Sequence, residues 1–212
     1  MTEDASSTTL SGVWIWDGSG SEPYGPADIH LRGDRIERID RADGDDRAGE
    51  QGDQGVRGGA AERFWVIPGL IDAHVHLTSS GDTGPAAQLA QLKQSTPYST
   101  LVAAAQAQKT VAAGFTTVRD AGAPSGIVLG LRDAIRDGLL TGPRILAAGA
   151  PLSITGGHGD EANGWPDEVI FGTRSVADGV DEVRRATRDQ LRRGADWIKL
   201  FTSGGVLSEG DI

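Results

Sequence analysis

Two patterns of hydrophobic and polar positions divide this chain. In residues 10–39, short apolar runs are separated by Gly and Asp turn signals, and apolar and polar residues alternate from His30 to Ile39. Alternation with a period of two is typical of a strand that is half-buried on one face, and Gly33-Asp34 supplies a turn. The pattern therefore predicts a small β-layer that contains a hairpin around Gly33-Asp34.

From residue 64 onward, strand-like apolar runs alternate with stretches that have helical spacing. The predicted strands cover residues 64–76, 116–120, 144–148 and 196–201. The predicted helices cover residues 97–113 and 126–137 and a segment that begins at a capping pattern on Ser175 and stops at Gly194. Strands that alternate with helices predict an α/β fold with parallel strands and with active residues at their carboxyl ends. An open flavodoxin-like sheet would give the same coarse pattern.

Residues 40–63 separate the two regions and are rich in Gly, Asp, Arg and Gln, with almost no apolar residue. Such a segment buries too little apolar surface to offset the entropy of ordering, so we expect an acidic, glycine-rich mobile insertion. The predicted domains are residues 1–63, with the β-layer and this insertion, and residues 64–212.

The amino-acid composition limits which side chains can carry chemistry and which partners the chain can bind. The 212 residues include no cysteine, which excludes disulfides and thiolate ligands and leaves His, carboxylates and Lys. Thirty acidic against twenty basic residues give a formal net charge of −10, which argues against nucleic acid and anionic membranes as partners. The N-terminus lacks a signal-peptide pattern, and no apolar run approaches the ~18 residues that span a bilayer. We therefore expect a soluble cytoplasmic protein.

Two imidazoles lie two residues apart at the end of an apolar run, in Asp72-Ala-His74-Val-His76. Because side chains alternate along a strand, His74 and His76 point to the same side, with Cα atoms roughly 7 Å apart. Two neutral imidazoles suit zinc, and also manganese, iron or nickel. By parity Asp72 faces the same side, where we expect it to support the strand end. Alone, a His-x-His pair can also be two ordinary strand histidines.

Four further residues stand out. Lys199, one of only three lysines, is flanked by apolar residues at the end of the last predicted strand. His158 lies between glycines, which allow a loop to fold closely over a ligand, although a turn with a solvated imidazole has the same composition. Asp120 ends the second predicted strand and is a supporting candidate, with Arg119 beside it as a weaker one.

The segment Val66-Ile-Pro-Gly-Leu-Ile-Asp-Ala-His-Val-His-Leu77 resembles the opening strand of the amidohydrolase superfamily, and Lys199 and the His158 loop match it as well. The resemblance implies the N-terminal half of a (β/α)8 TIM-type barrel, strands one to four, preceded by part of a small β-sandwich. It implies a metal centre of His74, His76 and Lys199, in which a CO2-derived carbamate on the lysine holds one or two divalent ions, zinc being expected. It also implies that His158 binds the substrate and that Asp72 and Asp120 support the site.

The same resemblance implies hydrolysis of amide or peptide C–N bonds by metal-activated hydroxide, with Xaa-Pro or N-acyl amino acid substrates. Imidazolonepropionase-like cyclic amide hydrolysis and a non-catalytic amidohydrolase fragment are the alternatives. A nucleotide-binding module is disfavoured, because neither G-x-x-x-x-G-K-[ST] nor a complete G-x-G-x-x-G motif between strand and helix occurs.

The family's general-base aspartate and two further metal-binding histidines have no counterpart in this chain. We therefore expect a truncated enzyme with no catalytic residue of its own. Its partner would be a complementary barrel half or a second copy, and the activity of the isolated chain is left open.

Overall fold

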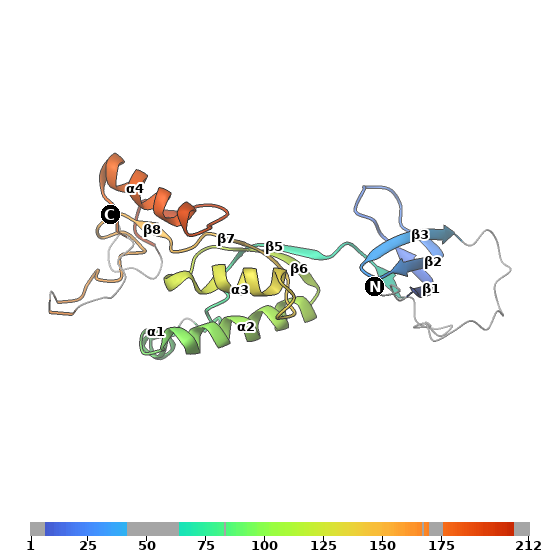
Figure 1. The fold of residues 1–212 in the computed structure, drawn as a ribbon, viewed down its shortest axis with the longest axis horizontal. Helices are drawn as coiled ribbons and strands as arrows, with labels where there is room; N and C mark the ends of the chain where they lie inside the picture. The colour runs from blue at the N-terminus through green and yellow to red at the C-terminus, as the bar shows by residue number, and fades with distance from the viewer. Residues whose placement is uncertain (1–6, 42–63, 83, 167, 170–175, 206–212) are drawn as a thin grey trace. The chain divides into compact units, whose positions relative to one another are not determined.

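The computed structural model describes residues 7–41, 64–82, 84–166, 168–169 and 176–205 (Figure 1). The chain divides into two compact units, residues 1–68 and 69–212. This division falls later than the expected boundary after residue 63, because β4 (Trp65–Val66) pairs in parallel with β1 (Ser7–Ile15) and so belongs to the first unit.

The first unit is a sheet with the strand order β3-β2-β1-β4. Strands β2 (Tyr24–Arg32) and β3 (Arg35–Arg41) form the predicted antiparallel hairpin around Gly33-Asp34. The core of this unit consists of four buried side chains, those of Val13, Ile15, Ala27 and Ile29. Residues 40 and 41, expected at the start of the insertion, belong to β3, and residues 42–63 lie outside the described residues.

The second unit contains a parallel sheet with the order β5-β6-β7. Its strands are β5 (Leu70–Val75), β6 (Phe115–Asp120) and β7 (Arg144–Ala147). The helical segments between them are α1 (Pro85–Leu92), α2 (Thr96–Ala112), the short 3-10 helix η1 (Pro124–Gly126) and α3 (Ile127–Arg136). Figure 1 shows α2 and α3 along one face of this sheet. The predicted alternation of parallel strands and helices is therefore present.

The core of the second unit lies between these helices and the strands. Val118 and Ile145 of the sheet are buried against Ala103 and Ala107 of α2 and Val128 of α3. Alanines on α2 let the helix approach closely, and Ser95 caps it by accepting a hydrogen bond from the backbone N–H of Tyr98. The helices thus cover one face of the sheet. In the part of the chain that the structure describes, no helix is long and apolar enough to cross a membrane.

The single strand predicted over residues 64–76 is wrong, because the structure has two strands there. Pro68 carries no N–H for a ladder, and Gly69 lies against the side chain of Thr116, so the chain leaves one sheet and enters the other at this dipeptide. The carboxyl half of the predicted strand, with the histidines at its end, is β5.

The fourth predicted strand, residues 196–201, is shorter than expected. Only β9 (Leu200–Phe201) is a strand, and it pairs in parallel with β8 (Leu152–Ser153). Residues 196–199, which precede β9, make other hydrogen bonds, including one from the Asp196 backbone N–H to the Ala147 carbonyl. The turn at Gly149 and Pro151 interrupts β7 before β8, so the fourth strand meets a separate two-stranded sheet.

The last helix, α4 (Gly179–Arg192), begins later than the capping pattern on Ser175 predicts. Val176 forms a parallel bridge with Ser153, and the Ala177 backbone N–H donates to the Ser153 carbonyl. These bonds hold the backbone extended until Asp178. Ser175 itself lies outside the described residues.

Candidate functional site

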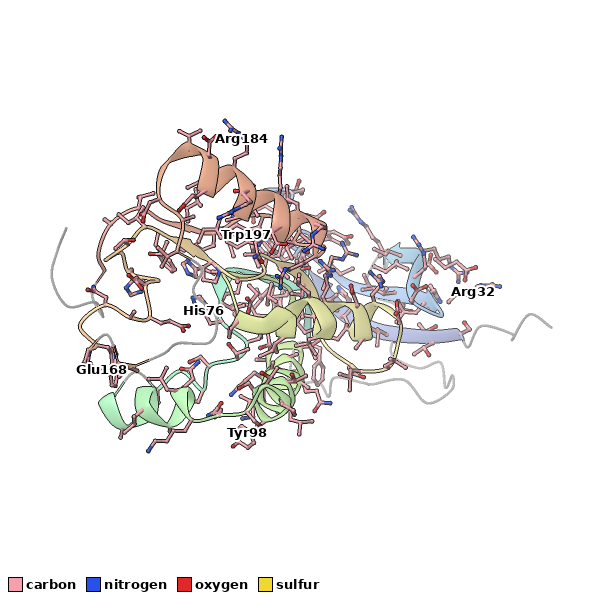
Figure 2. The ribbon with its side chains drawn as sticks, turned by 60° about the vertical axis from the view of Figure 1, so that its left-hand side comes forward. Arg32, His76, Tyr98, Glu168, Arg184 and Trp197 are labelled. Atoms are coloured by element: carbon pink, nitrogen blue, oxygen red, sulfur yellow. The ribbon has the colours of Figure 1, made fainter. Side chains whose placement is uncertain are left out.

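His74 and His76 lie at the carboxyl end of β5 with their ring centroids 5.5 Å apart (Figure 2, where His76 is labelled). Both side chains are exposed. The Nδ1 atom of His76 lies 3.1 Å from the Gly122 carbonyl oxygen, to which its N–H donates. That bond engages Nδ1, and Nε2 of His76 has no hydrogen-bond partner among the described residues, which is how metal-binding histidines are commonly oriented. The arrangement therefore fits imidazole ligation of a divalent ion.

A β-bulge in β5 presents His74. Asp72 pairs with Val118 and Val75 pairs with Asp120, so β5 contains one residue more than β6 between these two pairs. The backbone N–H of His74 donates to Oδ1 of Asp72 at 3.0 Å. Because of this bulge, the alternation of side chains along an unbroken strand does not by itself predict which way each side chain of β5 points. The Asp72 carboxylate binds the backbone of His74.

Asp120 is completely buried beside the histidines. Its carboxylate accepts hydrogen bonds from the backbone N–H groups of Leu77, at 2.8 Å, and Gly122, at 3.0 Å. Burial raises the pKa of Asp120, although these two bonds act in the opposite direction. Leu77 follows His76, and Gly122 supplies the carbonyl that His76 binds, so Asp120 orders both neighbours of this imidazole.

Lys199 lies just before β9, half-buried, with Nζ 4.8 Å from the ring centroid of Phe201. Burial lowers the pKa of His74, and the charge of Lys199 is the next largest cause, which places the ammonium within electrostatic reach of that imidazole. A free ammonium repels a divalent ion, whereas a carbamate on the same nitrogen is an anionic oxygen donor. Among the described residues, His, Asp and Glu side chains form no group of three that could hold a metal.

His158 lies in the loop after β8, with its ring edge-on to Phe201 at 4.9 Å between centroids. Its backbone N–H donates to the Ser203 carbonyl at 3.0 Å, while Nδ1 is buried without a hydrogen-bond partner. A side chain on Gly205 would come within 2.5 Å of this atom, so a glycine is needed there. Since Lys199 and His158 contact the same phenylalanine ring, β9 brings the two predicted residues together.

An open cavity of about 390 Å³ borders His76. Polar side chains of Ser79, Gln106 and Thr110 contribute to its lining. Gln106 and Thr110 were not predicted, because they lie within the alanine-rich pattern of α2 and no spacing links them to the histidines. Trp197, whose indole N–H donates to the Leu146 carbonyl at 3.3 Å, was not predicted either.

Residues 65–212 match the sequence model of the amidohydrolase family. This chain belongs to the amidohydrolase family. The match confirms the resemblance drawn from the histidine segment. Ochratoxinase of Aspergillus niger is 35% identical over 170 residues, covering 69% of this chain and 32% of that protein.

Solved structures of family members are also similar to this amidohydrolase chain. A Xaa-Pro dipeptidase with methionine bound in its active site is 30% identical, with a TM-score of 0.73, over 96% of this chain and 48% of that one. A prolidase in complex with N-methylphosphonate-L-proline is 28% identical, with a TM-score of 0.70, over 98% and 49%. The chain thus spans about half the length of these solved relatives, which is consistent with a partial barrel.

Proposed function

We propose that this amidohydrolase chain supplies the metal-binding part of a hydrolase that cleaves C–N bonds in amides or peptides, with substrates of the Xaa-Pro or N-acyl amino acid type. The observation that carries the proposal is the His74-His76 pair, in which the Gly122 carbonyl holds the His76 imidazole through Nδ1 and no described residue bonds its Nε2. The similarity to a Xaa-Pro dipeptidase and to a prolidase supports the substrate class.

Each residue has a role in this proposal. His74, His76 and a carbamylated Lys199 would hold one or two divalent ions, with zinc as the expected metal. Such an ion would supply polarisation of the scissile carbonyl and activation of water. Asp72 and Asp120 hold the backbone around the histidines through the bonds described above.

His158 would contact the substrate. Its Nδ1 is buried without a hydrogen-bond partner among the described residues. A substrate with a carboxylate beside the scissile bond, as in Xaa-Pro and N-acyl amino acid compounds, offers an acceptor for an imidazole N–H of His158. A cyclic amide substrate, as in the imidazolonepropionase-like alternative, remains a second prediction that no specific contact favours.

The first test is the metal content of the purified 212-residue chain, measured by plasma mass spectrometry after incubation with zinc and bicarbonate. We expect about one or two equivalents, with loss in the double variant His74→Ala/His76→Ala. His30→Ala is the matched control, because His30 bonds Thr9 and Asp40 in the first unit and should not affect metal content. Equal metal in the double variant and the parent would refute the site.

Substrate class is tested separately, with Xaa-Pro dipeptides and N-acyl amino acids compared against the corresponding amides that lack the carboxylate. The proposal predicts that His158→Ala weakens binding of the carboxylate-containing compounds by about tenfold and leaves binding of the others unchanged. Equal loss for both sets would show that His158 has no part in carboxylate recognition.

A further inference from the structure

Arg119 completes the backbone hydrogen bonding of the bulge that carries His74. Where β5 contains its extra residue, the ladder with β6 is interrupted, and a carbonyl there needs another partner. Nε of Arg119 donates to the Ala73 carbonyl oxygen at 2.7 Å, on the peptide that leads into His74. Asp72 binds the N–H on the other side of the same peptide. Two side chains therefore hold this one peptide group.

Arg119 also contacts the chain that leads to Lys199. Its guanidinium carbon lies 4.6 Å from the ring centroid of Trp197, which precedes Lys199 by two residues. The indole N–H of Trp197 in turn donates to the Leu146 carbonyl of β7. One side chain on β6 thus joins the His74 peptide to the segment before β9. Trp197 is labelled with His76 in Figure 2.

We infer that Arg119 is a positioning residue, which sets the orientation of His74 and its separation from Lys199 through the Ala73 carbonyl and the Trp197 ring. This inference rests on the proposed metal site. The planar guanidinium matters here because it can donate along its edge and stack along its face at the same time, which an ammonium cannot do. Its charge is no advantage, since a cation near a divalent ion is repelled by it.

The decisive variant is Arg119→Lys, which keeps the charge and removes the planar, edge-and-face geometry. Arg144→Lys is the matched control, because the side chain of Arg144 is exposed at the start of the adjacent strand β7 and makes no hydrogen bond or ion pair with the described residues. A second variant, Trp197→Leu, removes the aromatic face on which the guanidinium of Arg119 stacks. It tests the same connection if Arg119→Lys does not fold, and unchanged His74 signals in folded Trp197→Leu would then overturn the inference.

The first readout needs no metal. In protein labelled with [15N]histidine, the His74 imidazole signals are assigned from their absence in His74→Ala. We expect Arg119→Lys and Trp197→Leu to shift or broaden the His74 signals, while His30 in the first unit stays unchanged and Arg144→Lys behaves as the parent. Unchanged His74 signals in folded Arg119→Lys would overturn the inference.

The second readout is zinc affinity, measured by competition with a chromophoric chelator. Changes to groups that orient metal-binding residues commonly cost 10–100-fold in affinity, so we expect about a tenfold loss in Arg119→Lys at an unchanged melting temperature of the metal-free chain. Parent-like affinity in Arg119→Lys would count against the inference. If the parent binds no zinc, the proposed function fails, and the imidazole signals still decide the role of Arg119.

Discussion

Gly69 is the residue at which two strands leave no room for a side chain. A Cβ built on Gly69 would lie 2.0 Å from Oγ1 and 2.7 Å from Cβ of Thr116. Because Cβ of Thr116 is fixed to the backbone, Gly69→Ala has to push β5 away from β6. We expect a loss of about 1–3 kcal/mol in the free energy of unfolding, measured by urea denaturation followed by circular dichroism.

Gly130→Ala is the control for this substitution, because Gly130 lies within α3 with open space around it. There the added methyl group should stabilise by about 0.4–1 kcal/mol. Thr116→Ala removes the two nearest atoms, so the double variant Gly69→Ala/Thr116→Ala should lose less than the sum of the single variants. Equal effects at Gly69 and Gly130 would show that the close contact has no energetic consequence.

At the residue scale, the sequence predicted which side chains to examine but not how they are held. The imidazoles, Asp72 and Lys199 stand out from spacing and from their apolar neighbours. The contact between Arg119 and the Ala73 carbonyl depends on a bulge, and a bulge arises from the register of two strands distant in sequence. Strand periodicity assumes unbroken pairing and cannot show such a contact.

At the element scale, Asp178 connects the first turn of α4 to the His158 loop. Its carboxylate accepts hydrogen bonds from the hydroxyl and the backbone N–H of Thr155, and these bonds lower the pKa of Asp178 below its ordinary value of 3.8. A lowered pKa means that the ionised carboxylate is favoured in the folded state. This contribution is therefore present above pH 3.8 and is lost as the pH falls below it.

We predict that Asp178→Asn speeds hydrogen exchange at the loop amides of Gly157 and Gly159 at pH 6, relative to the parent. The difference should shrink as the pH falls below 3.8, because the parent then loses the same interaction. Asp181→Asn is the matched control, since Asp181 is an exposed acidic residue in the same turn that pairs with Arg184. A difference that persists unchanged at low pH would show that the carboxylate charge is not responsible.

Elements whose ends are fixed by nearby residues were predicted well. Ser95 is the N-cap of α2 and Pro97 lies in its first turn. The observed helix begins and ends within one residue of the predicted bounds. The two inaccurate strands depend on distant partners: β4 pairs with β1, and β9 pairs with β8. Pairing across such distances is set by the whole fold, so local pattern gives the type of element more reliably than its extent.

At the scale of the whole molecule, the two units have separate cores. Ile29 is buried in the first core and Ile145 in the second, and no residue is shared between them. Because cooperative unfolding follows the contacts of a core, we predict two thermal transitions in differential scanning calorimetry, each sensitive to one of these residues. Each isoleucine-to-alanine change should cost about 2–5 kcal/mol and lower its own transition by on the order of 10 °C.

The two variants control for each other, since they delete the same atoms from buried sites in different units. Ile36→Ala adds a surface control, because Ile36 is 59% exposed on β3 and its truncation should leave both transitions in place. If Ile29→Ala lowered both transitions equally, the units would unfold as one cooperative body. In that case a substitution in the sheet of the first unit would also destabilise the β-bulge at His74, and the proposed metal site would depend on residues 1–68 for its stability.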